Sequence, residues 1–560
     1  MLNGMISSVS GAVNTSGSNV TVDSDAQFVS GSDNNIAIGA NALNSTTTDA
    51  ADYNIAIGTS ALTAVTTGGS NIGIGHNTGA ALLGKTGNIG IGTHSLVSAT
   101  CNDAISIGYY AMSSAAAQTG TIAIGSTSLQ SLTSGQKNIA IGYQALKEHT
   151  TGGGNIAIGD GAMNETAGAT SSTSSDNMFV GVDSGGGDWA DATSAYNIGI
   201  GNETLKGALN GANYNFAIGY QAMLVHTTGD RNIAIGYQTM VNTDAGANSL
   251  SSGDNIFIGH QSGGGTWGNT SASAQNVCVG NYTMDAALDG GDGNTCIGHG
   301  SLSALTTGSD NVGVGKNAGT TLTTGTDNTF VGMESGDATD DGSYNVAMGY
   351  RSLSANCGDE NTAIGFQAGI VVTGDNNVCI GATAGDAITS GDGNVAVGRG
   401  SDCAATADNQ IAIGNGAVTD GANKIRLGNA SIATCNIQTD WTVDSDVRIK
   451  KEIVDNTLGL SFINNLKPRK YKKLHPADWD EAIKEDRYKD GFRDEFDDKK
   501  IWDGLIAQEV KEAVDKAGVT FSGWEIDSKG KQGVQYSSLV VPLIKAVQEL
   551  SQQIEDLKKG

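Results

Sequence analysis

The sequence is poor in proline, in aromatic residues and in long hydrophobic runs. Its 560 residues include only 3 prolines beside 81 glycines, and aromatic residues make up 5% of the chain. A collagen triple helix needs glycine at every third position and abundant proline, so this composition excludes one. Glycine combined with many Asn, Asp, Ser and Thr residues instead predicts tight turns between short strands.

Basic residues are scarce before Asp444, and the chain carries a net charge of −27. Most of the lysines and arginines follow Asp444, so the acidic excess lies in the earlier part. Such a surface repels nucleic acid and anionic membranes, and we expect neither as a partner. No hydrophobic run is long enough to span a bilayer, which argues against membrane insertion. The first residues also lack the basic and apolar regions of a signal peptide.

Cysteine is present in an odd number, 7, and no Cys-x-x-Cys pair occurs. Cys278, Cys296 and Cys379 occupy a repeat position that alanine usually fills, so we interpret them as small buried side chains rather than metal ligands. The acidic turns lack the spaced carboxylates of a calcium-binding loop, which favours ordinary turns. The sequence therefore predicts no metal and no cofactor, and synthesis in a reducing compartment.

A short motif, Asn-Ile-Ala-Ile-Gly, recurs along most of the chain. Copies begin, for example, at Asn35, Asn155, Asn232, Asn311 and Asn394. There are about 23 copies, most often about 17 residues apart, and a fixed short period of this kind is typical of a solenoid. We therefore predict a mainly β protein with a parallel β-solenoid or β-roll over residues 34–440, after an N-terminal segment, 1–33.

Each copy is predicted to form a short strand, a glycine turn and a second short strand such as 143–146. The second and fourth motif positions are Ile or Val and share one face of the strand, so we expect them to fill the core of the coil. The third position is mostly Ala, Gly or Cys. A face kept this small suits close contact between chains, which predicts an oligomer.

Three copies carry phenylalanine at the small position, and two of them precede a tryptophan. Phe179, Phe257 and Phe330 each come before a segment with glycine in place of the usual Ala-Leu, so the ring is expected to fill the vacated volume. Trp189 and Trp267 lie in insertions after the first two of these copies. Two hypotheses fit these indoles: stacking on a receptor sugar, or folding back as lids over Phe179 and Phe257.

The composition changes at Asp444, where the run Ser445-Asp-Val-Arg-Ile-Lys450 begins. Serine is a poor nucleophile unless a neighbour takes its proton, and lysine can be that base if burial lowers its pKa. Ser445 and Lys450 are five residues apart, so a bend could bring Nζ to Oγ. The alternative is a solvated basic strand without chemistry.

Four motifs in order carry a resemblance over residues 445–560: Ser445–Lys450, Leu466–Tyr471, Asp503–Val510 and Gln535–Ala546. This tail resembles the intramolecular chaperone domain of phage tail spikes and fibres, the S74 autopeptidase family. The resemblance implies an α+β domain at 441–560 that assists folding and trimerisation. It also implies a single cleavage of the Asp444–Ser445 bond, with Ser445 as nucleophile and Lys450 as general base.

The last helix is expected to carry an apolar seam with alternating steps of three and four. The seam residues are Leu543, Val547, Leu550, Ile554 and Leu557. The seam fits either a coiled coil or an amphipathic helix packed on its own domain. We expect both, with a homotrimer as the family resemblance implies.

The repeats resemble the head repeats of trimeric adhesins, which form a left-handed parallel β-roll, and the repeats of phage fibres. Together the two resemblances predict a homotrimeric tail fibre of the virion, made in the host cytoplasm, that binds a host cell-surface glycan or protein. Residues 1–33 are a candidate attachment to other tail proteins. Two alternatives stay open: a polysaccharide depolymerase with paired carboxylates, and a bacterial trimeric adhesin. The repeats themselves are not expected to be enzymatic.

Overall fold

The computed structural model describes the chain except residues 1–33, 46–50, 115–118, 167–172, 190–191, 244–251, 269, 433–434, 437, 439–442, 486–487, 494 and 528. The predicted attachment segment 1–33 lies outside the described residues. The chain divides into two compact units, residues 1–361 and 362–560. Among the described residues, no helix is both long enough and apolar enough to cross a bilayer.

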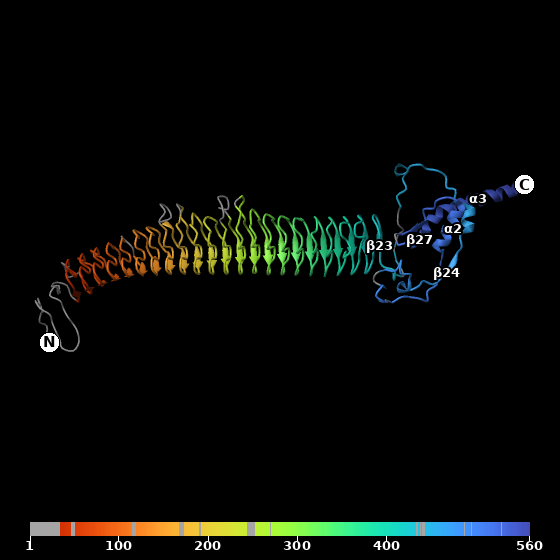
Figure 1. Cartoon of the computed structure of the whole chain (residues 1–560). Coiled ribbons are helices and arrows are strands. Elements are labelled where there is room, and N and C mark those ends of the chain that lie inside the picture. The colour runs from red at the N-terminus through yellow and green to blue at the C-terminus, as the bar shows by residue number, and fades with distance from the viewer. Residues whose placement is uncertain are drawn as a thin grey trace. The chain divides into compact units, whose positions relative to one another are not determined.

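The first unit is a ladder of parallel strands of three residues each (Figure 1). Each strand pairs in register with the next, as Ile139 does with Ile156. These strands are β1 (Ile36–Ile38), β2 (Ile55–Ile57), β3 (Ile72–Ile74), β4 (Ile89–Ile91), β5 (Ile105–Ile107), β6 (Ile122–Ile124), β7 (Ile139–Ile141), β8 (Ile156–Ile158), β9 (Met178–Val180), β10 (Ile198–Ile200), β11 (Phe216–Ile218), β12 (Ile233–Ile235), β13 (Ile256–Ile258), β14 (Val277–Val279), β15 (Thr295–Ile297), β16 (Val312–Val314), β17 (Thr329–Val331) and β18 (Val346–Met348). The predicted parallel β-solenoid is confirmed.

The same repeat opens the second unit. Its ladder comprises β19 (Thr362–Ile364), β20 (Val378–Ile380), β21 (Val395–Val397), β22 (Ile411–Ile413) and β23 (Ile425–Leu427). Each of these strands also pairs in parallel with the next.

Each coil contains one strand, not the two that the sequence predicts. The segment 143–146, expected as a second strand, is a turn in which Gln144 and Leu146 have positive φ values of 57° and 51°. A coil this short must reverse direction within a few residues, and left-handed residues achieve this. Leu146 still contributes to the core, because its side chain is fully buried.

The prediction that the second and fourth motif positions fill the core of the coil is wrong. The small third position points into the coil and is buried, whereas the second and fourth positions are half-buried or exposed. The interior is narrow: a Cβ added at Gly73 would lie 2.7 Å from Cγ of Leu62. Little room therefore remains for a second large side chain opposite a buried turn residue such as Leu62. The Ile and Val side chains at the second and fourth motif positions consequently face outward. The cysteines at the third position, including Cys278 and Cys296, are buried as predicted.

Asparagine and glycine hold successive coils together. The backbone N–H of Asn71 donates to Oδ1 of Asn54 at 3.0 Å, and its side-chain amide donates to the carbonyl of Lys85 at 2.8 Å. The glycine after each strand has a left-handed φ, +141° at Gly142, where a Cβ would lie 2.2 Å from the carbonyl oxygen of Gly159. Only glycine permits both this conformation and this spacing.

The rest of the second unit is a small α+β fold, as predicted. It comprises α1 (Leu460–Asn465), β24 (Arg469–Tyr471), β25 (Trp502–Gly504), α2 (Ala507–Ala517), β26 (Trp524–Ile526), β27 (Gln532–Val534), α3 (Val540–Lys559) and the 3-10 helices η3 (Val447–Ile449), η4 (Pro476–Asp478) and η6 (Tyr536–Leu539). β24 pairs antiparallel with β25, and β26 with β27. The core is formed by Leu458, Phe462, Val510, Ala513, Val514, Phe521 and Leu539.

Candidate functional site

The turn after Asp444 brings the two predicted catalytic side chains together. Asp446 caps η3, because its carboxylate accepts the backbone N–H of Arg448 at 2.8 Å. The N–H of Lys450 then donates to the carbonyl of Val447 at 3.1 Å and closes the turn. As a result, Nζ of Lys450 donates a hydrogen bond to Oγ of Ser445 over 2.5 Å.

An ion pair reinforces this turn. The guanidinium of Arg448 contacts both carboxylate oxygens of Asp446, at 3.0 Å from Nε and 2.7 Å from Nη2. Hydrogen bonds from Arg448 also hold the pKa of the Asp446 carboxyl below its usual value. Arginine and aspartate are thus used to shape the turn, which leaves the lysine free to approach the serine.

The arrangement has the components of serine-lysine chemistry: a hydroxyl, an adjacent amine and, immediately before them, the Asp444 peptide bond. Asp444, Ser445 and Lys450 are all exposed in the single chain. An amine acts as a base only in its neutral form, which burial favours. The catalytic roles of Ser445 and Lys450 therefore remain a prediction, although their proximity is observed.

Residues 445–519 match the Peptidase_S74 family, described as a chaperone of endosialidase. The match begins at the serine of the pair, so the C-terminal part of the chain carries an S74 domain directly after a β-solenoid. A comparison with curated proteins finds no match for this chain. The family match ends before α3, so it does not extend to the predicted seam.

The seam of α3 is left uncovered by the S74 domain. Its five residues, Leu543, Val547, Leu550, Ile554 and Leu557, are between 44% and 81% exposed. A different part of the helix packs on the domain: Pro542 and Ala546 are buried, and the carboxylate of Glu549 accepts the N–H of Leu460 at 2.7 Å. The helix thus packs on its own domain and still presents an apolar seam.

The predicted receptor-binding role of the two tryptophans is corrected by the structure. Trp189 and Trp267 are each 1% exposed, so neither indole can stack on an external sugar. Their rings lie 6.0 and 5.8 Å from those of Phe179 and Phe257, as the lid hypothesis predicts. Each Nε1–H also donates to a carbonyl four residues before it. The three phenylalanine rings fill the predicted space, since a Cβ on Gly185 would lie 2.8 Å from Phe179.

Two aspartates near the end of the repeats come together, but without the spacing of a glycosidase. Asp386 and Asp402 hydrogen-bond through their side chains, and burial raises the pKa of Asp402 to about 7. Glycoside hydrolysis uses carboxyl groups roughly 5 to 10 Å apart. Directly hydrogen-bonded carboxyls are closer, so this pair gives no support to a depolymerase. Among the described residues, no group of three or more His, Cys, Asp or Glu side chains is arranged to hold a metal ion.

One contact in this unit has no counterpart in the sequence predictions. Arg426, the middle residue of β23, forms an ion pair with Glu485. The available signal was the arginine itself, which stands at a motif position that is otherwise small or aromatic. Its partner, 59 residues further along the chain, could not be inferred from spacing.

Proposed function

We propose that this chain is a homotrimeric phage tail fibre whose S74 domain directs trimerisation and folding and then releases itself. The observation that carries the proposal is the hydrogen bond between Lys450 and Ser445 at the first residue of the family match. In the chain, the Ser445–Lys450 pair comes after a long parallel β-solenoid. Parallel ladders require non-local pairing, fold slowly and expose edges, so a C-terminal clamp that holds three chains in register has a clear purpose.

The proposed cleavage starts with the Ser445 hydroxyl. Its Oγ attacks the carbonyl carbon of Asp444 while Lys450 Nζ, in its neutral form, takes the hydroxyl proton. The C–N bond then breaks, the proton passes to the departing α-amine of Ser445, and Asp444 is left as an ester on Oγ. Water hydrolyses the ester, which frees the Asp444 carboxylate and restores the hydroxyl. The reaction occurs once per chain.

Two uncovered apolar surfaces support the trimer. One is the seam of α3. The other is the outer row of the solenoid, which consists of the residues at the second and fourth motif positions, the first and last residues of strands β1–β23. Members that are clearly exposed include Ile36, Ile200, Val279, Ile297, Ile380, Ile413 and Ile425. Rows of exposed apolar side chains often mark sites of interaction with another protein chain. Two further copies of the chain would cover both surfaces.

Trimer formation would also provide the exclusion of water that a neutral lysine base needs. In the single chain the serine-lysine pair is open to solvent, and a charged lysine is no base. A neighbouring chain packed over the turn would exclude water from Lys450. Cleavage would then follow assembly rather than precede it, and removal of the clamp would make the folded fibre kinetically hard to reverse.

The remaining parts of the proposal concern location and partners. The fibre belongs to the virion tail, with residues 1–33 as the attachment to other tail proteins. Its target is a host cell-surface glycan or protein. The buried tryptophans are not the contact, so the receptor is bound by another part of the surface.

Substitution of the pair tests the proposed function. The wild-type chain is expected to separate into residues 1–444 and 445–560, whereas Ser445→Ala and Lys450→Ala should each remain at full length on a denaturing gel. Lys451→Ala, which removes the neighbouring lysine, is the matched control and should still be cleaved. Cleavage of Ser445→Ala, or an intact wild-type trimer, would exclude this mechanism.

A further inference from the structure

The last strand of the repeat ladder differs from all the others. In β1 to β22 the inward residue is Ala, Gly, Ser, Cys or Phe, and in β23 it is Arg426. A cation at this position would be costly inside a coil, because burying an unpaired charge is strongly unfavourable. Arg426 therefore marks the end of the ladder, where no further described strand covers the inward position.

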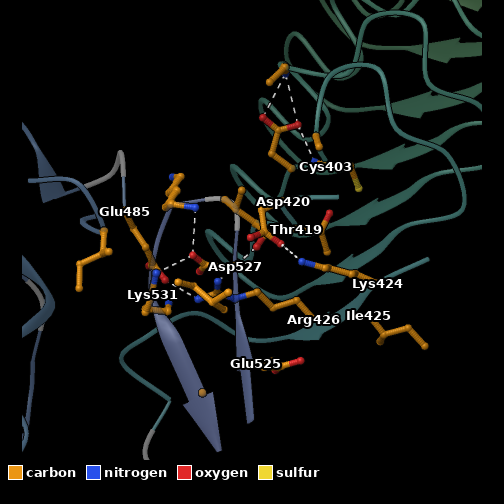
Figure 2. Close-up of a pocket in the computed structure, with 18 of the residues that line it drawn as sticks. Cys403, Thr419, Asp420, Lys424, Ile425, Arg426, Glu485, Glu525, Asp527 and Lys531 are labelled. Atoms are coloured by element: carbon orange, nitrogen blue, oxygen red, sulfur yellow. Dashed lines mark hydrogen bonds and ion pairs between the residues drawn. The ribbon is translucent and has the colours of Figure 1, made fainter. Parts of the chain in front are cut away.

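Each nitrogen of the Arg426 guanidinium donates one hydrogen bond at this end. Nε donates to the carbonyl of Gly428 at 3.1 Å, and Nη1 donates to the carbonyl of Val418 at 3.2 Å. Nη2 donates to the carboxylate of Glu485, as Figure 2 shows. Two bonds thus hold the arginine within its own coil, and the third points it at the S74 domain.

The Glu485 side chain that accepts this hydrogen bond is buried. It is only 8% exposed, and its second carboxylate oxygen, Oε2, is buried without a hydrogen bond. Other acidic groups, Asp420 and Asp527, line the same cleft of about 670 Å³. Three lysines, Lys424, Lys529 and Lys531, also line this cleft. Glu485 nevertheless forms its ion pair with Arg426, and loss of that pair would leave the buried carboxylate without this partner.

A second hydrogen bond lies beside the ion pair. Ser431, which follows the last strand, and the hydroxyl of Tyr488 lie 2.7 Å apart. Tyr488 is 1% exposed and its ring packs edge-on against His475, with centroids 5.7 Å apart. The two contacts therefore come from Glu485 and Tyr488 of the S74 domain, and both meet the chain within or just after β23.

We propose that Glu485 and Tyr488 of the S74 domain recognise the finished end of the solenoid by binding Arg426 and Ser431. Only the carboxylate of this pair is buried, since the Arg426 side chain is 30% exposed. An ion pair that encloses a buried charge adds little net stability, but loss of its partner is costly, which suits the pair to specificity. Arg426 reaches Glu485 only when β23 has been added to the ladder, so the contact reports that the last coil is in place. Resting on the proposed function, the same contact would slow the departure of the cleaved S74 domain from the fibre.

Hydrogen exchange on the intact chain tests the recognition without relying on cleavage. In a Ser445→Ala background, Glu485→Gln should raise the exchange rate of amides in residues 411–428 by about tenfold or more, because the terminal coil loses its cap. Glu525→Gln is the matched control: Glu525 lines the same cleft and is exposed, so exchange should be unchanged. Arg426→Glu should behave like Glu485→Gln, and the exchanged pair Arg426→Glu with Glu485→Arg should restore protection.

Equal exchange in Glu485→Gln and Glu525→Gln would overturn the inference, as would a reversed pair that fails to restore protection. Size-exclusion chromatography of the chain with Ser445 intact then examines the consequence for release. Soon after cleavage the S74 fragment should still co-elute with the fibre fragment in the wild type, and it should separate sooner in Glu485→Gln. Absence of any cleavage would contradict the proposed function, while the exchange result would still decide the recognition.

Discussion

Between the first and last strands of the repeat ladder, each inward side chain is buried by the neighbouring coils, whereas the S74 domain encloses a small core and leaves much apolar surface open. Ala140, Leu146 and Phe257 are fully buried in the solenoid. By contrast Val447, Ile449, Ile453 and Val454, close to the serine-lysine turn, are all mostly exposed.

The difference assigns separate tasks to the two regions. A ladder with the same asparagine, glycine and aliphatic positions in every coil is stable once stacked, but it does not specify which coil of one chain faces which coil of another. The S74 domain has a unique sequence and unfilled apolar surfaces, so it can set that register. If this comparison is correct, deletions or substitutions in the S74 domain and its last helix should prevent assembly. Substitutions inside the coils should instead lower the stability of the solenoid.

Removal of the S74 domain should have the largest effect. A chain that ends at Asp444 is expected to aggregate or stay monomeric, since nothing aligns the solenoids. The full-length Ser445→Ala protein, which retains the domain, is the control and should yield a soluble trimer in sedimentation. An SDS-resistant trimer from the truncated chain would refute the division of tasks.

Charge in the helix seam should have the next largest effect. Leu550→Asp with Ile554→Asp places two carboxylates in the proposed interface. The trimer should be lost because burying these charges among apolar seam residues, without a cationic partner, is strongly unfavourable. Gln552→Asp adds a carboxylate on the opposite side of the helix from the seam and should leave the trimer intact. Mass photometry distinguishes the two, and a trimeric seam variant would contradict the proposed interface.

Loss of the buried indoles should weaken the solenoid without preventing assembly. Trp189→Ala with Trp267→Ala is expected to lower the free energy of unfolding by about 3–5 kcal/mol per site, the usual cost of truncating a buried tryptophan. The exposed Tyr143→Ala is the matched control and should shift the thermal midpoint little. Unchanged melting of the double variant with reduced adsorption to cells would instead restore the receptor-binding hypothesis.

A buried histidine should give the solenoid a measurable acid sensitivity. Burial lowers the pKa of His149 from 6.5 to about 4, and the ring lies within hydrogen-bonding distance of Thr166 and the carbonyl of Gly152. Below about pH 6.5 the imidazole is protonated in the unfolded chain, whereas in the folded chain it stays neutral down to about pH 4. The free energy of unfolding therefore falls as the pH drops from about 6.5 to about 4. The loss should approach about 3 kcal/mol.

Denaturant unfolding between pH 7 and 4 measures this loss. His149→Gln should reduce the pH dependence, whereas His299→Gln, at an exposed position, should leave the slope unchanged. Identical slopes in the wild type and His149→Gln would show that this histidine is not responsible.

The sequence predicted the ladder and the proximity of Ser445 to Lys450, because both depend on short spacings along the chain. It did not predict which strand face is buried. Alternation shows that Ile139 and Ile141 share a face, but only the width of the coil decides that Ala140 points inward. The partnership of Arg426 with Glu485 was also inaccessible, since it depends on how the S74 domain folds rather than on a motif.

The most direct measurement of the central claim is the intact mass and N-terminal residue of the small fragment made by the wild-type chain. Self-cleavage by the proposed pair predicts a fragment that begins at Ser445 and ends at Gly560, appears only after trimers have formed, and is absent from Ser445→Ala and Lys450→Ala. A fragment that begins at any other residue, or a folded trimer that keeps all 560 residues, would contradict the account.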